Sequence, residues 1–220
     1  MEKRVSILLA CLAISALAIS TASYGQTINL IDPGFEGAVT GAGGVGGWGT
    51  FGGATFSSDV AHSGTNSMKE FGAGGYSVPG AFETFPAAAG DAWTFSGFAL
   101  TPGINTNLSL ADFGGVQIAF FSGTGANLGT VETAPGTALF GNKITGASTP
   151  NVWIPVSVTA HAPVGTASVQ MFDIVIDQTP THMYFDDMSA LAFSVPEPST
   201  VVLSLTGLFG LVAFAKKRRV

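Results

Sequence analysis

Cysteine is almost absent from this chain of 220 residues, and its single copy, Cys11, lies in an apolar N-terminal stretch. With one cysteine the chain cannot form an internal disulfide, and everything after Cys11 lacks thiol chemistry. A domain built from the remaining residues must therefore be held together by its hydrophobic core, with or without a bound metal ion.

Positive charge is scarce in the middle of the chain. Six of the eight lysines and arginines lie near the two ends, which leaves only Lys69 and Lys143 between residues 26 and 194. The same region holds twelve acidic residues, so its net charge is -10. Because nucleic acids and anionic lipids are bound by clustered cations, this charge excludes both as partners of the middle region. A calcium ion or an uncharged ligand fits it better.

Familiar catalytic patterns are missing as well. His62, His161 and His182 lie in separate stretches, and none has metal-ligand spacing to another histidine or to a cysteine. No Gly-x-Ser-x-Gly sequence occurs, so a hydrolase triad has no starting point. The adjacent acids Asp186 and Asp187 point to opposite faces of a strand, whereas glycoside hydrolysis needs two carboxyls that face each other across a cleft. The sequence therefore predicts a protein that is not an enzyme.

Short apolar stretches, separated by glycine, proline and small polar residues, fill the chain from residue 26 to about residue 193. In 116–121 and 152–159 every second residue is apolar, which is typical of a half-buried strand. The stretch 93–100 is apolar on both faces, as expected between two packed layers. Since no segment shows a helical period with caps, we predict an all-β fold, an antiparallel β-sandwich over residues 26–194.

Six short pieces of this region resemble, in order, the jelly-roll, galactose-binding-like domains found in many carbohydrate-binding modules. The pieces are 29–37, 48–51, 61–69, 87–98, 153–163 and 184–191. Each piece is weakly specific alone, but their order covers nearly the whole domain. The resemblance implies a jelly-roll fold and carbohydrate binding as one function of such a domain.

Domains of this kind often hold one structural calcium ion where the first and last strands meet. The resemblance implies that Glu36 and Asp186 supply carboxylates, while the loop 62–64 adds carbonyl oxygens to the six to eight that calcium takes. Strict alternation would place Asp186 on one face with Tyr184 and Met188, where a carboxylate needs a metal or a charged partner. The alternative is that these acids are solvated groups near strand ends.

Aromatic side chains can stack on the apolar faces of sugar rings. Trp48 and Tyr76 lie in glycine-rich stretches, so we predict that they contact a ligand. The alternative for both is that they are scattered exposed aromatics, which are common on protein surfaces. Trp93 and Trp153 match positions that look like framework residues, and we expect them in the core or at its rim.

The N-terminus, residues 1–25, has the layout of a secretory signal peptide. Lys3 and Arg4 precede a mostly apolar run over 5–19, and small residues follow that run. Cleavage is expected before Ser23 or Gln26, with Gln26 favoured. The layout predicts that the domain is exported.

The C-terminus, residues 195–220, combines three features in order. A Pro196-Glu197-Pro198 motif is followed by fifteen uncharged, mostly apolar residues, 201–215, and then by a basic end made of Lys216, Lys217, Arg218 and Arg219. As a helix, 201–215 would be roughly 22 Å long, short of the ~30 Å hydrocarbon core unless its flanks help. Because positive charge stays in the cytoplasm, we predict a short transmembrane helix that anchors the chain in the inner membrane with the domain outside.

This tail resembles the PEP-CTERM protein-sorting tail of Gram-negative bacteria. The resemblance implies that exosortase, a membrane cysteine transpeptidase, acts at the Pro-Glu-Pro motif and releases the protein to the cell surface or the medium. Such proteins often accompany exopolysaccharide and biofilm matrix. We therefore expect an exported, non-enzymatic surface or matrix protein. A carbohydrate-binding, lectin-like module is the alternative, and a polysaccharide-active enzyme is the third possibility.

Overall fold

The computed structural model describes residues 24–37, 47–103, 112–194 and Gly207. All twelve elements within the three segments are β-strands. They are β1 (Tyr24–Ile28), β2 (Gly49–Phe51), β3 (Ala54–Ser57), β4 (Ser67–Gly72), β5 (Gly80–Pro86), β6 (Ala92–Leu100), β7 (Phe113–Ser122), β8 (Asn127–Gly129), β9 (Leu139–Thr145), β10 (Ile154–His161), β11 (Thr166–Ile176) and β12 (Thr181–Ser194). The all-β prediction is confirmed.

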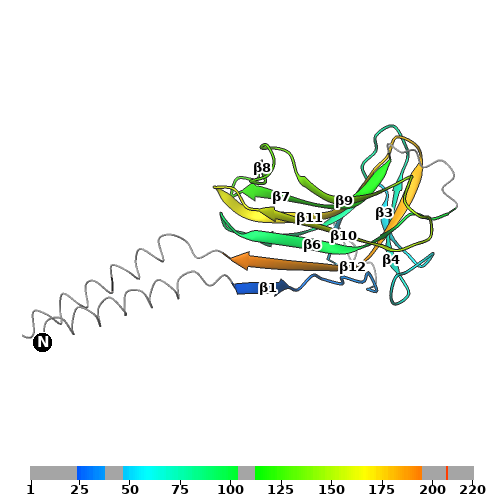
Figure 1. The fold of residues 1–220 in the computed structure, drawn as a ribbon, viewed down its shortest axis with the longest axis horizontal. Coiled ribbons are helices and arrows are strands. Elements are labelled where there is room, and N and C mark those ends of the chain that lie inside the picture. Colours follow the sequence, from blue (N-terminus) through cyan, green and yellow to red (C-terminus); the bar gives the residue numbers. More distant parts are fainter. Residues whose placement is uncertain (1–23, 38–46, 104–111, 195–206, 208–220) are drawn as a thin grey trace, which may run out of the picture. The chain divides into compact units, whose positions relative to one another are not determined.

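The strands form two six-stranded sheets that lie face to face (Figure 1). We call the sheet that contains β12 the front sheet and the other one the back sheet. In the front sheet the strand order is β10-β6-β12-β4-β3, and β1 also pairs with β12. In the back sheet the order is β2-β5-β11-β7-β8, and β9 also pairs with β7. Neighbouring strands run antiparallel in every pair whose register is known. The fold is an antiparallel β-sandwich, and the compact unit that contains it spans Gln26–Ala192.

Alternation along two strands matches the sequence pattern. On β7, Val116, Ile118 and Phe120 are all fully buried, so the prediction for 116–121 is confirmed. On β10, Val156 and Val158 are buried in the same way. These residues fill the space between the sheets, where each buried aliphatic or aromatic side chain contributes about 1.5–3 kcal/mol relative to an exposed one.

An aromatic cluster closes one part of the core. Phe35 contacts Trp48 and Phe56 with ring centroids 5.2 and 5.8 Å apart, and Trp48 in turn lies 6.3 Å from Phe95. The indole Nε1 of Trp48 donates a hydrogen bond of 2.7 Å to the carbonyl of Ile31, which satisfies its polar atom. The segment 29–37 is thereby fixed to the sandwich.

The last strand changes its inward face at Asp187, and this corrects the alternation assumed from the sequence. Met183 and Phe185 point into the core before this position, and Met188 does so after it, so one residue has been added to the alternation. Asp187 has φ +48°, the left-handed conformation that often accompanies a bulge. Tyr184 therefore lies on the face opposite to Met188, although simple alternation put the two together.

Three acidic side chains lie inside the sandwich. Glu70 on β4 and Asp173 on β11 are fully buried, and none of their four carboxyl oxygens has a hydrogen-bond partner. Glu83 on β5 is 5% exposed and accepts a 2.8 Å hydrogen bond from the N–H of Ile31. Burial raises the pKa of Glu70 well above its usual range, raises that of Asp173 to about 8 and raises that of Glu83 to about 7. Asp173 is therefore largely protonated at pH 7, and burial shifts Glu70 in the same direction.

Both lysines of the domain have partners. Lys143 on β9 places its ammonium nitrogen 4.0 Å from the ring centroid of Phe113 and 4.8 Å from that of Phe140. A cation over an aromatic face is stabilised by the ring quadrupole. Lys69 forms an ion pair with Asp59 at 2.6 Å.

Candidate functional site

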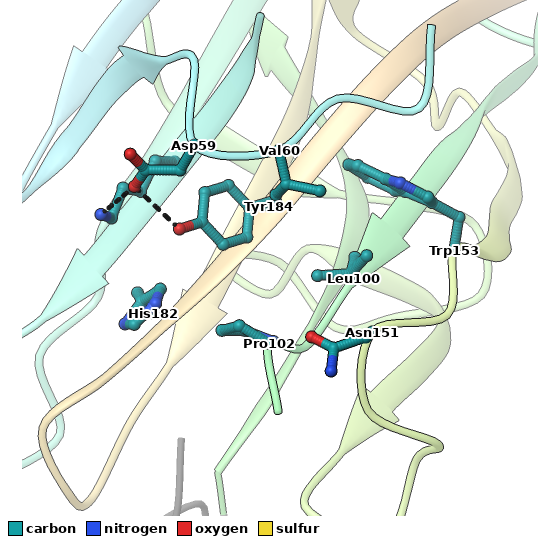
Figure 2. A pocket seen from close by; sticks show the side chains of 9 residues that line it. Asp59, Val60, Leu100, Pro102, Asn151, Trp153, His182 and Tyr184 are labelled. Atoms are coloured by element: carbon teal, nitrogen blue, oxygen red, sulfur yellow. Dashed lines mark hydrogen bonds and ion pairs between the residues drawn. The ribbon is translucent and has the colours of Figure 1, made fainter. Parts of the chain in front are cut away.

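A cleft of about 620 Å³ opens on the outer face of the front sheet (Figure 2). It receives side chains from β4, β6 and β12 and from the segments that follow β3 and β6 and precede β10. The lining residues are Asp59, Val60, Lys69, Leu100, Pro102, Asn151, Trp153, His182 and Tyr184. A concave site with a mostly apolar floor and a few polar groups is the usual form of a small-ligand or glycan site.

Strand pairing brings Lys69 and Tyr184 together at one end of the cleft. The two residues lie directly opposite each other in the β12–β4 register. Asp59, from the segment after β3, accepts hydrogen bonds from Lys69 Nζ at 2.6 Å and from the Tyr184 hydroxyl at 3.0 Å, drawn as dashed lines in Figure 2. The hydrogen bond from Lys69 lowers the pKa of Asp59, and the same bond raises the pKa of Lys69. This end of the cleft therefore carries one fixed pair of opposite charges.

His182 lies beside this pair and Trp153 lies at the other end of the cleft in Figure 2. The rings of His182 and Tyr184 meet edge to face with centroids 5.5 Å apart. Burial lowers the pKa of His182, and the positive charge of Lys69 lowers it further, so the imidazole is neutral at pH 7. Aromatic and heteroaromatic rings thus occur at both ends, with Leu100 and Pro102 between them.

A loop, residues 58–66, forms the upper wall of the cleft as drawn in Figure 2. It supplies Asp59 and Val60 to the lining. Further along the same loop, the ring of His62 stacks on Phe98 at a centroid distance of 3.8 Å and meets Trp153 edge-on at 5.6 Å. The position of this loop consequently determines where Asp59 and Val60 meet the cleft and what lies beside Trp153.

The two predicted calcium ligands lie beside this same loop. An ideal Cβ built on Gly34 would lie 3.9 Å from both Glu36 Cγ and Asp186 Oδ1, so the two acids approach the same point. Glu36 accepts bonds from the backbone N–H groups of Thr65 and Asn66 at 2.8 and 3.0 Å. The structure therefore brings together the 62–66 loop and both acids.

The carboxylate oxygens of both acids are engaged by hydrogen-bond donors of the protein. Both oxygens of Glu36 and both oxygens of Asp186 already accept hydrogen bonds from N–H or O–H donors. Among the residues that the structure describes, no group of three histidine, cysteine, aspartate or glutamate side chains is placed to hold a metal ion. Calcium binding by Glu36 and Asp186 stays a prediction, and the hydrogen bonds are what the geometry provides.

We predicted that two aromatic residues contact a ligand, and for Trp48 the prediction is wrong because this residue is buried. Trp48 has no exposed surface, because it belongs to the core cluster with Phe35 and Phe95, so it cannot stack on a sugar at the surface. Tyr76 is 67% exposed with φ +65°, but it is not part of the cleft lining, and its ligand contact stays a prediction. Trp93 is 3% exposed, which confirms its framework role.

Sequence reasoning missed most of the cleft. Trp153 was expected in the core or at its rim, and strict alternation placed Tyr184 on the same face as Met188. Two signals were available: Tyr184 and His182 share one face of a strand, and Lys69 is one of only two cations in the domain. A polar and aromatic face of this kind, next to an isolated lysine, indicates a ligand site rather than core packing.

The chain was compared with known proteins in three ways. No family model matches it, and no curated protein matches it. Among solved structures, the CBM22-1 xylan-binding domain from Paenibacillus barcinonensis Xyn10C is 15% identical, with TM-score 0.51 over 77% of this chain and 96% of that one. The CBM22-1-CBM22-2 tandem domain of the same Xyn10C is 14% identical, with TM-score 0.52 over 81% of this chain and 49% of that one.

The likeness to these structures establishes the architecture. The chain has the jelly-roll fold of carbohydrate-binding modules, as its sequence resemblance implied. Within the described part of the chain, no helix is long and apolar enough to cross a membrane. The predicted signal peptide, Pro-Glu-Pro motif, transmembrane helix and basic end lie outside the described residues, apart from Tyr24, Gly25 and Gly207.

Proposed function

We propose that this domain is a non-catalytic module that binds a carbohydrate chain in the cleft on the front sheet. The observation that carries the proposal is the composition of the lining: Trp153 and Tyr184 offer aromatic surface, while Asp59 and Asn151 offer hydrogen-bonding groups. Sugar rings have apolar faces that stack on aromatic side chains and hydroxyl groups that need polar partners. The cleft supplies both within one site.

The fold of the solved structures supports the same proposal. They are carbohydrate-binding modules, and one of them is described as a xylan-binding domain. Their identity to this chain is low, so the sugar that this chain binds is defined by its own cleft. The negative charge of the domain, -10 between residues 26 and 194, disfavours polyanionic glycans.

The lining favours binding over hydrolysis. It contains one carboxylate, Asp59, and that group is held by Lys69 and Tyr184. Glycoside hydrolysis generally uses two carboxyls on either side of the scissile bond. A polysaccharide-active enzyme remains the third candidate, and it would be recognised by the release of sugar products from the glycans that the protein binds.

The test is direct binding of the purified protein to a panel of polysaccharides. Affinity electrophoresis against neutral glycans, followed by calorimetry on oligosaccharides of the best one, is expected to give saturable binding. Absence of binding to every glycan, together with concentration-dependent self-association, would instead support a structural or adhesive matrix protein.

We further propose that the protein acts outside the cell, delivered by an exosortase-type route. The support is the order of the Pro196-Glu197-Pro198 motif, the apolar stretch and the basic end. The partners would be the sorting protease, the inner membrane and the organism's exopolysaccharide. Fractionation of cells with and without the protease tests this: unchanged membrane retention in both strains would leave a permanent anchor in place of sorting.

A further inference from the structure

The loop 58–66 forms one wall of the cleft. It is covalently connected to the sandwich only at its two ends, where it joins β3 and β4. Its contribution to the site depends on where it is held: Asp59 must reach Lys69 and Tyr184, and His62 must stack on Phe98 beside Trp153. A nine-residue loop that was free to move would lose these contacts, because ordering each residue costs about 1–2 kcal/mol of conformational entropy.

Glu36 holds the C-terminal part of this loop from the segment before β2. Its Oε1 accepts the N–H groups of Thr65 at 2.8 Å and Asn66 at 3.0 Å, and its Oε2 accepts the Thr65 hydroxyl at 2.7 Å. The N–H of Asn66 and the Thr65 hydroxyl lower the pKa of Glu36, so the acceptor is charged at neutral pH. Gly64, at φ +62°, lies so close that a Cβ there would be 2.1 Å from Glu36 Oε1.

Two acids of β12 hold the middle of the same loop. Asp186 Oδ2 accepts the N–H groups of His62 at 2.7 Å and Ser63 at 3.2 Å. Asp187 Oδ1 accepts the Ser63 hydroxyl at 2.7 Å, and its Oδ2 meets His62 Nδ1 at 2.6 Å. Both consecutive carboxylates thus reach the loop, and Asp187 has the left-handed backbone conformation at this point. None of these acids belongs to the cleft lining.

We propose that Glu36 and Asp186 are positioning residues for the cleft, which hold the loop 58–66 against the front sheet by direct hydrogen bonds and so preorganise the glycan site. This inference rests on the proposed function. Hydrogen bonds to a carboxylate are stronger than those to neutral acceptors, and a wall ordered before binding removes a cost that the ligand would otherwise have to meet. The action is independent of a metal ion.

The test uses the purified protein with Glu36→Gln and Asp186→Asn, each of which keeps the size of the side chain and replaces one acceptor oxygen by an N–H donor. Asp91→Asn is the matched control, because Asp91 likewise accepts a backbone N–H, that of Ala88 at 2.8 Å, in a turn that contributes nothing to the cleft lining. Thr65→Val is a milder variant that removes only the hydroxyl donor and covers the case in which Asp186→Asn does not fold.

Two readouts are needed. The first is the dissociation constant for the best glycan, which we expect to rise about threefold in Glu36→Gln, where the acid is exposed, and about tenfold in Asp186→Asn, where it is buried. The second is acrylamide quenching of tryptophan fluorescence. Trp48 and Trp93 are buried, so Trp153 supplies the accessible signal, and quenching should increase in both variants but not in the control.

All measurements are repeated in chelator and in excess calcium chloride. We expect the same difference between wild type and variants in both buffers. A difference that occurs only with calcium would assign the role to a bound ion and overturn the proposal, as would unchanged affinity and quenching in Glu36→Gln and Asp186→Asn. If the wild type binds no glycan, the proposed function fails, while quenching alone still decides whether the acids hold the loop.

Discussion

Lys69 and Glu70 are consecutive residues of β4, but they face opposite sides of the front sheet and have opposite surroundings. Lys69 points into the cleft, where it pairs with Asp59 in contact with solvent. Glu70 points into the core, where its burial and the nearby carboxyl of Asp173 raise its pKa. The cleft thus favours the charged form of its acid, whereas the core favours the neutral form of its acids. Strand β4 therefore separates the ion pair in the cleft from the buried carboxyls in the core.

The largest expected effect of this contrast is on the pH dependence of stability. Unfolded carboxyls ionise near pH 4, whereas folding raises the pKa of Asp173 to about 8 and that of Glu83 to about 7. The folded state therefore binds more protons between these values, and stability must fall as pH rises from about 5 to 9. Asp173 alone accounts for a change on the order of 5 kcal/mol. Urea unfolding at pH 5, 7 and 9 measures it, and a stability that stays level or rises would refute the prediction.

A single substitution in the core should remove part of this pH dependence of the unfolding free energy. Asp173→Asn replaces a carboxyl that must hold a proton with a neutral group of the same size. We expect the loss of stability between pH 5 and 9 to shrink by about half, since Glu83 with its pKa of about 7 still titrates, and we expect the variant to be more stable than the wild type at pH 9. The check is the same series of urea curves. An unchanged slope would mean that other groups control the pH response.

On the cleft side, the largest expected effect is on affinity. Trp153→Ala should weaken glycan binding about 10- to 100-fold with little change in stability, because the ring is partly exposed and forms one end of the cleft. Tyr76→Ala provides the comparison: Tyr76 is a large exposed aromatic outside the lining, and we expect a smaller loss. Calorimetry on both variants decides between them. Equal losses would extend the glycan site to Tyr76.

The smallest expected effect is the loss of the charge pair. Lys69→Met leaves Asp59 with the Tyr184 hydroxyl as its remaining side-chain partner across the cleft. Because Asp59 is exposed and solvent screens the pair, we expect only a small loss of unfolding free energy, and a still smaller one at high salt. Thermal unfolding at low and high salt measures it. A loss as large as that caused by ionising the core acids would show that the two sides of β4 are not independent.

The sandwich could be predicted from sequence because its evidence is local. Val116, Ile118 and Phe120 alternate with smaller or polar residues, and the pleat of a strand turns this alternation directly into a buried face. The resemblance of six short pieces to jelly-roll domains gave the same architecture. Both kinds of evidence depend on neighbouring residues and need no knowledge of which strands pair.

The site depended on facts that the sequence does not contain. The inward face of β12 changes at Asp187, which has a left-handed backbone conformation, so strict alternation wrongly placed Tyr184 on the same face as Met188. The glycine-rich surroundings of Trp48 suggested a surface loop, whereas its ring fills a gap left by Phe35 and Phe95 from distant segments. Glu70 and Asp173 lie about a hundred positions apart along the chain and meet only because β4 and β11 face each other across the core.

The scarcity of lysine has a consequence for the survival of the domain. Between residues 26 and 194 there is no arginine and there are only two lysines, so trypsin-like proteases have just two peptide bonds to attack. Lys69 is engaged by Asp59, and Lys143 lies against Phe113 and Phe140 on a paired strand. A protein exposed to secreted proteases would thus be resistant to this class of enzyme through its composition and its side-chain contacts together, with no disulfide needed.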